Sequence, residues 1–142
     1  NAQAVMESLP EFIKARAEVE GQAKVYDNQL KEMQTEIQKK AEEYDKTQAT
    51  MNDTKRKETE ATLQDLYQKF QQAQQDNAQA IQKLQNEKLQ PIVTKLQNAI
   101  KNVGKAGGYV YIMDLSSGIP YLSDTLSKDV TADVKAELNK LK

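Results

Sequence analysis

The sequence predicts a mainly α-helical fold with a small β-containing part (α+β): a long antiparallel helical hairpin of the coiled-coil type, and a few short strands. Apolar residues recur at steps of three and four along two long stretches, which is typical of helices that pack through one narrow seam. A polar segment separates these stretches, and a run of β-branched and aromatic residues follows them. The hairpin is therefore expected over residues 10–103, with residues 1–9 and 104–142 forming a separate base.

The first long helix is expected to begin at Pro10, because the first turn of a helix does not use the N–H that proline lacks. Residues 2–9 should form a short separate helical turn, since the residue before a proline avoids the α conformation. The seam positions are Val19, Ala23, Tyr26, Leu30, Met33, Ile37, Lys40, Tyr44, Thr47 and Met51. Because Lys40 and Thr47 are polar, the outer part of the seam should pack loosely.

The reversal of the hairpin is expected at about residues 52–59, NDTKRKET, which contain no large apolar side chain. The chain then returns as a second, antiparallel helix. Its seam positions are Leu63, Leu66, Phe70, Ala73, Asn77, Ala80 and Leu84. The small residues in the middle of this seam let the helices approach closely but bury little apolar area.

The second helix should continue past Pro91 with a kink and end at the glycines of residues 104–108. The run YVYIMDL, residues 109–115, is typical of a β-strand, and residues 116–118 can turn the chain into a second extended run over residues 119–123. We therefore expect a β-hairpin here.

The chain should close with an amphipathic helix between residues 129 and 142. Asp129 and Thr131 are both candidate caps for its N-terminus. Its apolar positions are Val130, Val134, Leu138 and Leu141.

The composition excludes most kinds of catalytic and metal site. The 142 residues include neither His nor Cys, which removes the usual nucleophiles, bases and zinc ligands. No Gly-rich phosphate loop is present, so we expect no cofactor and no enzymatic activity. Lys and Arg (20) nearly balance Asp and Glu (21), which disfavours nucleic-acid binding. No apolar run approaches the roughly 18 residues that a membrane span requires.

Four segments carry a resemblance to a known family: residues 1–12 (NAQAVMESLPEF), 89–108 (LQPIVTKLQNAIKNVGKAGG), 109–114 (YVYIMD) and 129–138 (DVTADVKAEL). In this order they resemble the Skp/OmpH family of periplasmic outer-membrane-protein chaperones. The resemblance implies a homotrimer in which strands of three subunits build a trimerisation base, with three coiled-coil tentacles around a cavity. In that family a further strand precedes the position of Asn1.

The function that the resemblance implies is that of an ATP-independent holdase, which shields unfolded outer-membrane proteins in the cavity between the tentacles in the periplasm. The best-known members are strongly basic, whereas this chain has a formal net charge of −1, so no lipopolysaccharide site is carried over. The alternative is a structural coiled-coil adaptor or spacer that docks a folded partner.

Two sets of candidate site residues follow. The run of residues 109–115 is too apolar for a lone exposed strand, which predicts burial between subunits; the alternative is a strand covered by the chain's own C-terminal helix. The candidate oligomerisation residues are Tyr109, Val110, Tyr111, Ile112, Met113 and Leu115. The candidate client contacts are Lys55, Arg56 and Lys57 at the tip, with Val25 and Ile81 off the seam. For the tip charges, the alternatives are a solvated turn and transient contact with anionic lipid headgroups.

Overall fold

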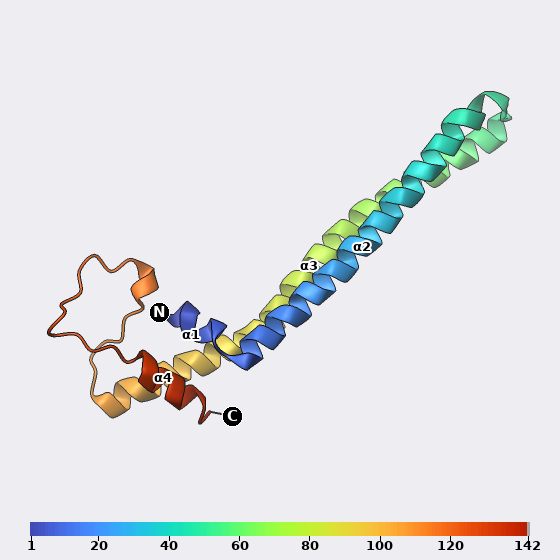
Figure 1. Ribbon diagram of the computed structural model, residues 1–142. Helices are drawn as coiled ribbons and strands as arrows, with labels where there is room; N and C mark the ends of the chain where they lie inside the picture. Colours follow the sequence, from blue (N-terminus) through green and yellow to red (C-terminus); the bar gives the residue numbers. More distant parts are fainter. Residues whose placement is uncertain (142) are drawn as a thin grey trace. The chain divides into compact units, whose positions relative to one another are not determined.

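The computed structural model describes residues 1–141, and α-helix dominates them (Figure 1). The elements in chain order are α1 (Ala2–Glu7), α2 (Pro10–Thr47), the 3₁₀-helix η1 (Gln48–Thr50), α3 (Asp53–Gly107), the 3₁₀-helix η2 (Leu115–Ser117) and α4 (Thr131–Leu138). The chain divides into two compact units: unit 1 contains Asn1–Glu18 together with the chain from Gln85 onward, and unit 2 is Val19–Leu84.

Unit 2 consists of parts of α2 and α3 that pack as an antiparallel pair. The Tyr44 hydroxyl of α2 donates a hydrogen bond to the Glu60 carboxylate of α3, close to the turn between the two helices. Every position assigned to either seam from the sequence is at least partly buried, which confirms both heptad patterns. Ile37, 5% exposed, is the only buried side chain among residues 19–84. The seam is therefore continuous but thin.

The chain reverses one turn earlier than the composition suggests. Residues 48–52 make the turn, and residues 53–59 already belong to α3. The reason is a helix cap: the side-chain oxygen of Asn52 accepts the N–H of Lys55 at 2.8 Å, which satisfies a donor in the first turn of α3. Polar residues after such a cap form a solvated helix rather than a loop.

Helix α3 continues through Pro91, as the periodicity predicts, and ends at the glycines. Gly108 has a φ of 65°. The N–H of Tyr109 donates to the carbonyl of Gly104 at 3.0 Å, and the N–H of Gly108 donates to that of Lys105 at 3.3 Å. This pair of bonds is a Schellman cap, which needs a residue in the left-handed conformation where glycine is favoured.

Gly107 has a different role, since the ring of Tyr109 lies against its backbone. A Cβ at residue 107 would lie 2.2 Å from Cε2 of Tyr109. We therefore expect Gly107→Ala to displace the Tyr109 ring and to change the near-ultraviolet tyrosine circular dichroism.

Gly21 provides the matched control, because nothing lies within 4 Å of the position its Cβ would take. Gly21→Ala should leave the tyrosine signal unchanged and stabilise α2 by about 1 kcal/mol, the difference in helix propensity between the two residues. Thermal unfolding measures the stability of both variants, and near-ultraviolet circular dichroism measures their tyrosine signal. An unaltered tyrosine spectrum in Gly107→Ala would contradict the packing of Tyr109 on residue 107.

Unit 1 holds the main hydrophobic core, to which four helical segments contribute. The start of α2 and the end of α3 are antiparallel here too, because Glu18 pairs with Lys88 at 2.5 Å and Glu11 pairs with Lys95 at 2.9 Å. The buried residues of this core are Val5, Leu9, Ala15, Ile92, Leu96, Ala99, Val134 and Leu138. The short helices α1 and α4 are held by tertiary packing, since isolated helices of their length are unstable in water.

Helix α4 uses the apolar face that its sequence predicts. Val134 and Leu138 are buried, and Val130 and Leu141 pack against them. The N-cap position is Val130, which makes no side-chain cap, so neither Asp129 nor Thr131 is the cap. The Asp129 carboxylate instead accepts the N–H of Thr131, the first residue of α4, at 2.8 Å. The pKa of Asp129 is lowered, first by the hydrogen bond from the Thr131 hydroxyl and then by the bond from this N–H.

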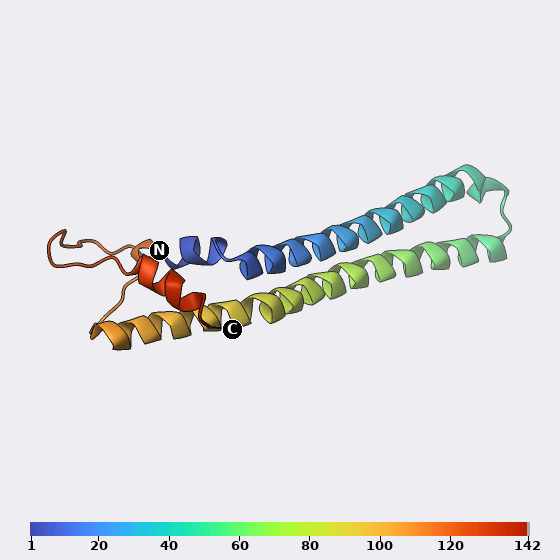
Figure 2. The same ribbon diagram turned by 60° about the horizontal axis from the view of Figure 1, so that its bottom comes forward.

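The expected β-hairpin is not formed within residues 1–141, which contain no strand (Figure 2). Residues 109–114 and 119–123 are irregular, and between them the turn is η2, closed by Gly118 with a φ of 77°. The sequence of these segments is typical of strands, but a strand also needs a neighbouring strand to bond with its backbone N–H and C=O groups. A two-stranded hairpin without further strands is only marginally stable in water.

Candidate functional site

The loop between α3 and α4 exposes most of the large apolar side chains that unit 1 leaves uncovered. We call this set the apolar surface. Its members, with their exposed fractions, are Val110 (84%), Tyr111 (77%), Met113 (62%), Leu115 (55%), Tyr121 (80%), Leu122 (48%) and Leu126 (91%). Single exposed apolar side chains are normal on a protein, but seven within 17 residues make this loop the candidate interaction surface.

Two inward-facing side chains hold the first part of this loop. Tyr109 lies against Gly107, and the ammonium group of Lys128 lies 5.8 Å from the centre of its ring. Ile112 is partly buried, and a Cβ on Gly104 would lie 3.5 Å from its Cδ1, which is ordinary van der Waals contact. Tyr111 and Met113, on either side of Ile112, are largely exposed.

Asp114 supplies a polar anchor in the same segment. One carboxylate oxygen accepts the N–H of Ala2 and the N–H of Ser116, each at 3.1 Å. The other accepts the Ser116 hydroxyl at 2.7 Å. The pKa of Asp114 is lowered, chiefly by the hydrogen bonds from the Ser116 hydroxyl and amide and then by the bond from Ala2. The segment is therefore tied to the start of α1.

A pocket of about 650 Å³, partly open to solvent, lies in unit 1 between the loop and the helical core. Val5 of α1, Leu96 of α3 and Val134 of α4 line it on the core side, and Tyr111 and Met113 line it from the loop. The loop thus covers the core incompletely, and a mostly apolar space remains beneath it.

Of the six candidate oligomerisation residues, the structure places four on the apolar surface and uses two as anchors. Val110, Tyr111, Met113 and Leu115 are exposed, whereas Tyr109 and Ile112 are partly buried. Sequence reasoning missed the second half of the surface. The apolar content of residues 119–126 was the available signal, but without a regular period it did not indicate which side chains would be exposed. The second half consists of Tyr121, Leu122 and Leu126.

The three basic candidates lie in the first turns of α3 and do not form one patch. Successive residues on a helix point about 100° apart, so Lys55, Arg56 and Lys57 face different directions. The Lys55 ammonium nitrogen lies 3.8 Å from a carboxylate oxygen of Glu58. The Arg56 side chain is partly buried and donates a hydrogen bond to the carbonyl of Met51 at 3.4 Å. Lys57 is exposed.

The off-seam candidates differ from each other in exposure. Val25 is 47% exposed, whereas Ile81 is partly buried. Tyr67, which the sequence did not single out, is 51% exposed. Unit 2 therefore presents isolated apolar side chains rather than a continuous apolar patch.

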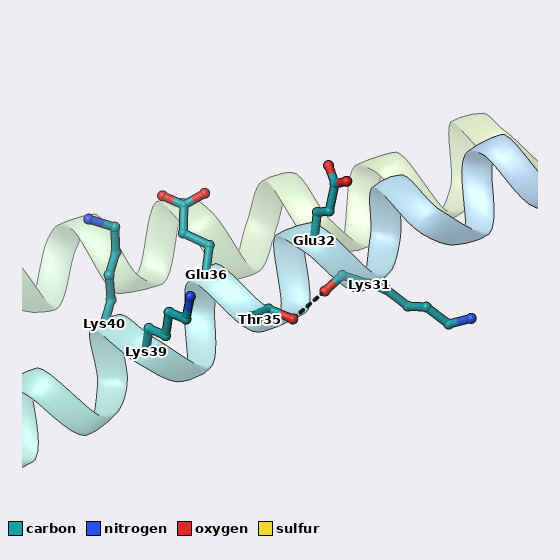
Figure 3. Close-up of a pocket in the computed structure, with 6 residues that line it drawn as sticks. All are labelled: Lys31, Glu32, Thr35, Glu36, Lys39 and Lys40. Atoms are coloured by element: carbon teal, nitrogen blue, oxygen red, sulfur yellow. Dashed lines mark hydrogen bonds between the residues drawn. The ribbon is translucent and has the colours of Figure 1, made fainter.

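A shallow hollow of about 590 Å³ runs along α2 in unit 2 (Figure 3). All six side chains that line it come from this one helix, and they carry both signs of charge. They are Lys31, Glu32, Thr35, Glu36, Lys39 and Lys40. The one hydrogen bond among them is local, from the Thr35 hydroxyl to the carbonyl of Lys31 at 2.8 Å. This arrangement is a solvated helix face.

No group of three or more potential metal ligands occurs among residues 1–141. Within the same residues, no helix is both long enough and apolar enough to span a bilayer.

These features define a class of protein: an antiparallel helical-hairpin protein with an exposed apolar surface next to its C-terminal helix. The family model described as "Outer membrane protein (OmpH-like)" matches residues 1–138. The chain therefore belongs to the OmpH-like family.

Two curated relatives carry the name "Chaperone protein Skp". The protein from Yersinia enterocolitica is 27% identical over 134 residues, which cover 94% of this chain and 80% of the relative. The protein from Pectobacterium atrosepticum is 26% identical over 138 residues, which cover 94% of this chain and 79% of the relative. Both alignments include residues of unit 1 and unit 2, because each alignment covers 94% of this chain.

Proposed function

We propose that the protein is an ATP-independent periplasmic holdase chaperone, a homotrimer that shields unfolded outer-membrane proteins between its helical hairpins. Membership of the OmpH-like family and the name of both relatives, "Chaperone protein Skp", support the chaperone class. The single structural observation that carries the proposal is the apolar surface of unit 1, because a chain that exposes it alone would be prone to aggregate.

Self-association explains the apolar surface most simply. Residues 109–115 and 119–123 have the composition of strands but lack partners within the described chain. Strands from sister copies would satisfy their backbone N–H and C=O groups and cover their apolar side chains. In this proposal, residues 1–9 and 104–142 form the base of the assembly, and residues 10–103 form the arm.

The thin seam of unit 2 suits arms that adapt to clients of different size. Ile37 is the only buried side chain of that unit, and Ala73, Asn77 and Ala80 occupy the middle of the α3 seam. A pair of helices held by so little buried area can open locally at low free-energy cost. Isolated contacts such as Val25, Ile81 and the charges of residues 55–57 would then each bind weakly. Three arms together gain affinity through effective concentration.

A direct test mixes the purified protein with a urea-unfolded outer-membrane β-barrel protein during dilution into buffer, without nucleotide. Light scattering should fall to the buffer baseline at about one trimer per client. A folded β-barrel of the same sequence is the matched control and should not bind.

Tight binding to the folded barrel, with no suppression of scattering, would contradict the holdase function and favour an adaptor that docks a native partner. Suppression that needs ATP would contradict the passive mechanism.

A further inference from the structure

Asp114 is the one charged residue inside the first half of the apolar surface. Its sequence neighbours Met113 and Leu115 are 62% and 55% exposed, whereas Asp114 itself is partly buried. A carboxylate within an apolar interaction surface would oppose association unless its oxygens were already satisfied within the chain. The structure shows that they are: both oxygens accept hydrogen bonds.

We propose that Asp114 is a positioning residue for self-association, whose carboxylate fixes residues 109–115 against the start of α1 and so orders the first half of the apolar surface before subunits meet. This inference rests on the proposed self-association. It names Asp114 as the residue that orders the segment before the subunits associate.

The contacts of Asp114 connect three parts of unit 1. Through the N–H of Ala2, the carboxylate reaches a residue 112 positions away in the sequence. Through Ser116 it fixes the first turn of η2, and its own main-chain carbonyl accepts the N–H of Ser117 at 3.1 Å. Hydrogen bonds to an ionised acceptor are about twice as strong as neutral ones. One side chain therefore sets both the position of the segment and the point at which it turns.

The remaining anchors hold the other end of the segment. Ile112 packs next to Gly104, and Tyr109 packs on Gly107, both near the end of α3. Without the carboxylate, Met113 and Leu115 would have no fixed position, because neither is buried. Ordering mobile side chains and backbone at the moment of association costs free energy, and pre-organisation removes that cost.

The inference predicts that Asp114→Ala weakens self-association by about tenfold, in line with the loss of hydrogen bonds to a charged group. Sedimentation equilibrium of the full chain over a range of concentrations measures it. Asp114→Asn retains an acceptor for Ala2 and Ser116 and should restore most of the association. Asp124→Ala is the matched control, since Asp124 is an exposed aspartate of the same loop.

A second readout separates positioning from general stability. Hydrogen exchange at the Ser116 amide should accelerate in Asp114→Ala, because that N–H loses its acceptor. The thermal midpoint of the α-helical signal should stay within the range of Asp124→Ala, since the hydrogen bond that the carboxylate makes to α1 is to the backbone N–H of its first residue and involves no buried core side chain.

The outcomes distinguish this inference from the proposed function. A wild-type chain that remains monomeric at every concentration overturns both. A wild-type chain that assembles, together with an Asp114→Ala variant that assembles equally well, overturns the positioning role alone. Equal weakening by Asp114→Ala and Asp124→Ala would also overturn it, because the effect would then be one of loop charge.

Discussion

Replacing Tyr111 by aspartate is expected to weaken self-association of the chain by at least about 100-fold while leaving its helix content unchanged. Tyr111 is 77% exposed in the single chain, so the substitution removes little intramolecular packing. In the proposed assembly the same position is covered by a sister copy, and an aspartate there would be a buried charge without a partner, which costs several kcal/mol. Mass in solution, measured by sedimentation equilibrium, reports the effect.

Tyr67→Asp is the control for this prediction. Tyr67 is also an exposed tyrosine, 51% accessible, but it belongs to unit 2 and lies outside the apolar surface. Its replacement should leave the mass in solution unchanged. If Tyr111→Asp assembles as well as the wild type, the apolar surface is not the subunit interface and the proposed base has to be abandoned.

Leu138→Ala is expected to destabilise unit 1 by about 2–5 kcal/mol, the usual cost of truncating a buried leucine. Leu138 is 1% exposed and belongs to the core that α1, α3 and α4 share. Since α4 is only eight residues long, loss of this contact should release the helix from the core. Urea unfolding monitored by circular dichroism, and hydrogen exchange across residues 131–138, measure the loss.

Leu126→Ala provides the comparison within the same unit, because Leu126 is 91% exposed. At a dilution where both variants have the same oligomeric state, its effect on stability should stay within about 0.5 kcal/mol. A Leu138→Ala variant as stable as Leu126→Ala would show that α4 does not depend on the core for its structure.

The helical part of the fold was predictable because its determinants are local and periodic. A narrow seam requires an apolar or small residue every three or four positions, and both series, from Val19 to Met51 and from Leu63 to Leu84, are at least partly buried. The glycine cap after α3 and the apolar face of α4 could also be predicted from the sequence, since each depends on a few neighbouring residues. The turn was placed too late because Asn52 was taken as part of a loop instead of as a helix cap.

The candidate site was only partly predictable. Composition identified residues 109–115 as too apolar for a lone strand, and four of the six chosen side chains are exposed. It could not separate the anchors Tyr109 and Ile112 from the exposed residues, because that division depends on contacts with Gly107 and Gly104 of α3. It also gave Asp114 no role, because its partner Ala2 is 112 residues away in the sequence.

The amino-acid sequence by itself determined two long antiparallel helices, their seams, the start of α2 and the end of α3, because each of these follows from spacing and capping within one or two turns of chain. Tertiary structure decided how α1, α4 and the start of α2 gather on the end of α3, and which side chains of the loop remain exposed. Those choices depend on which distant surfaces fit together and on which backbone groups find hydrogen-bond partners, and neither is encoded at any single position.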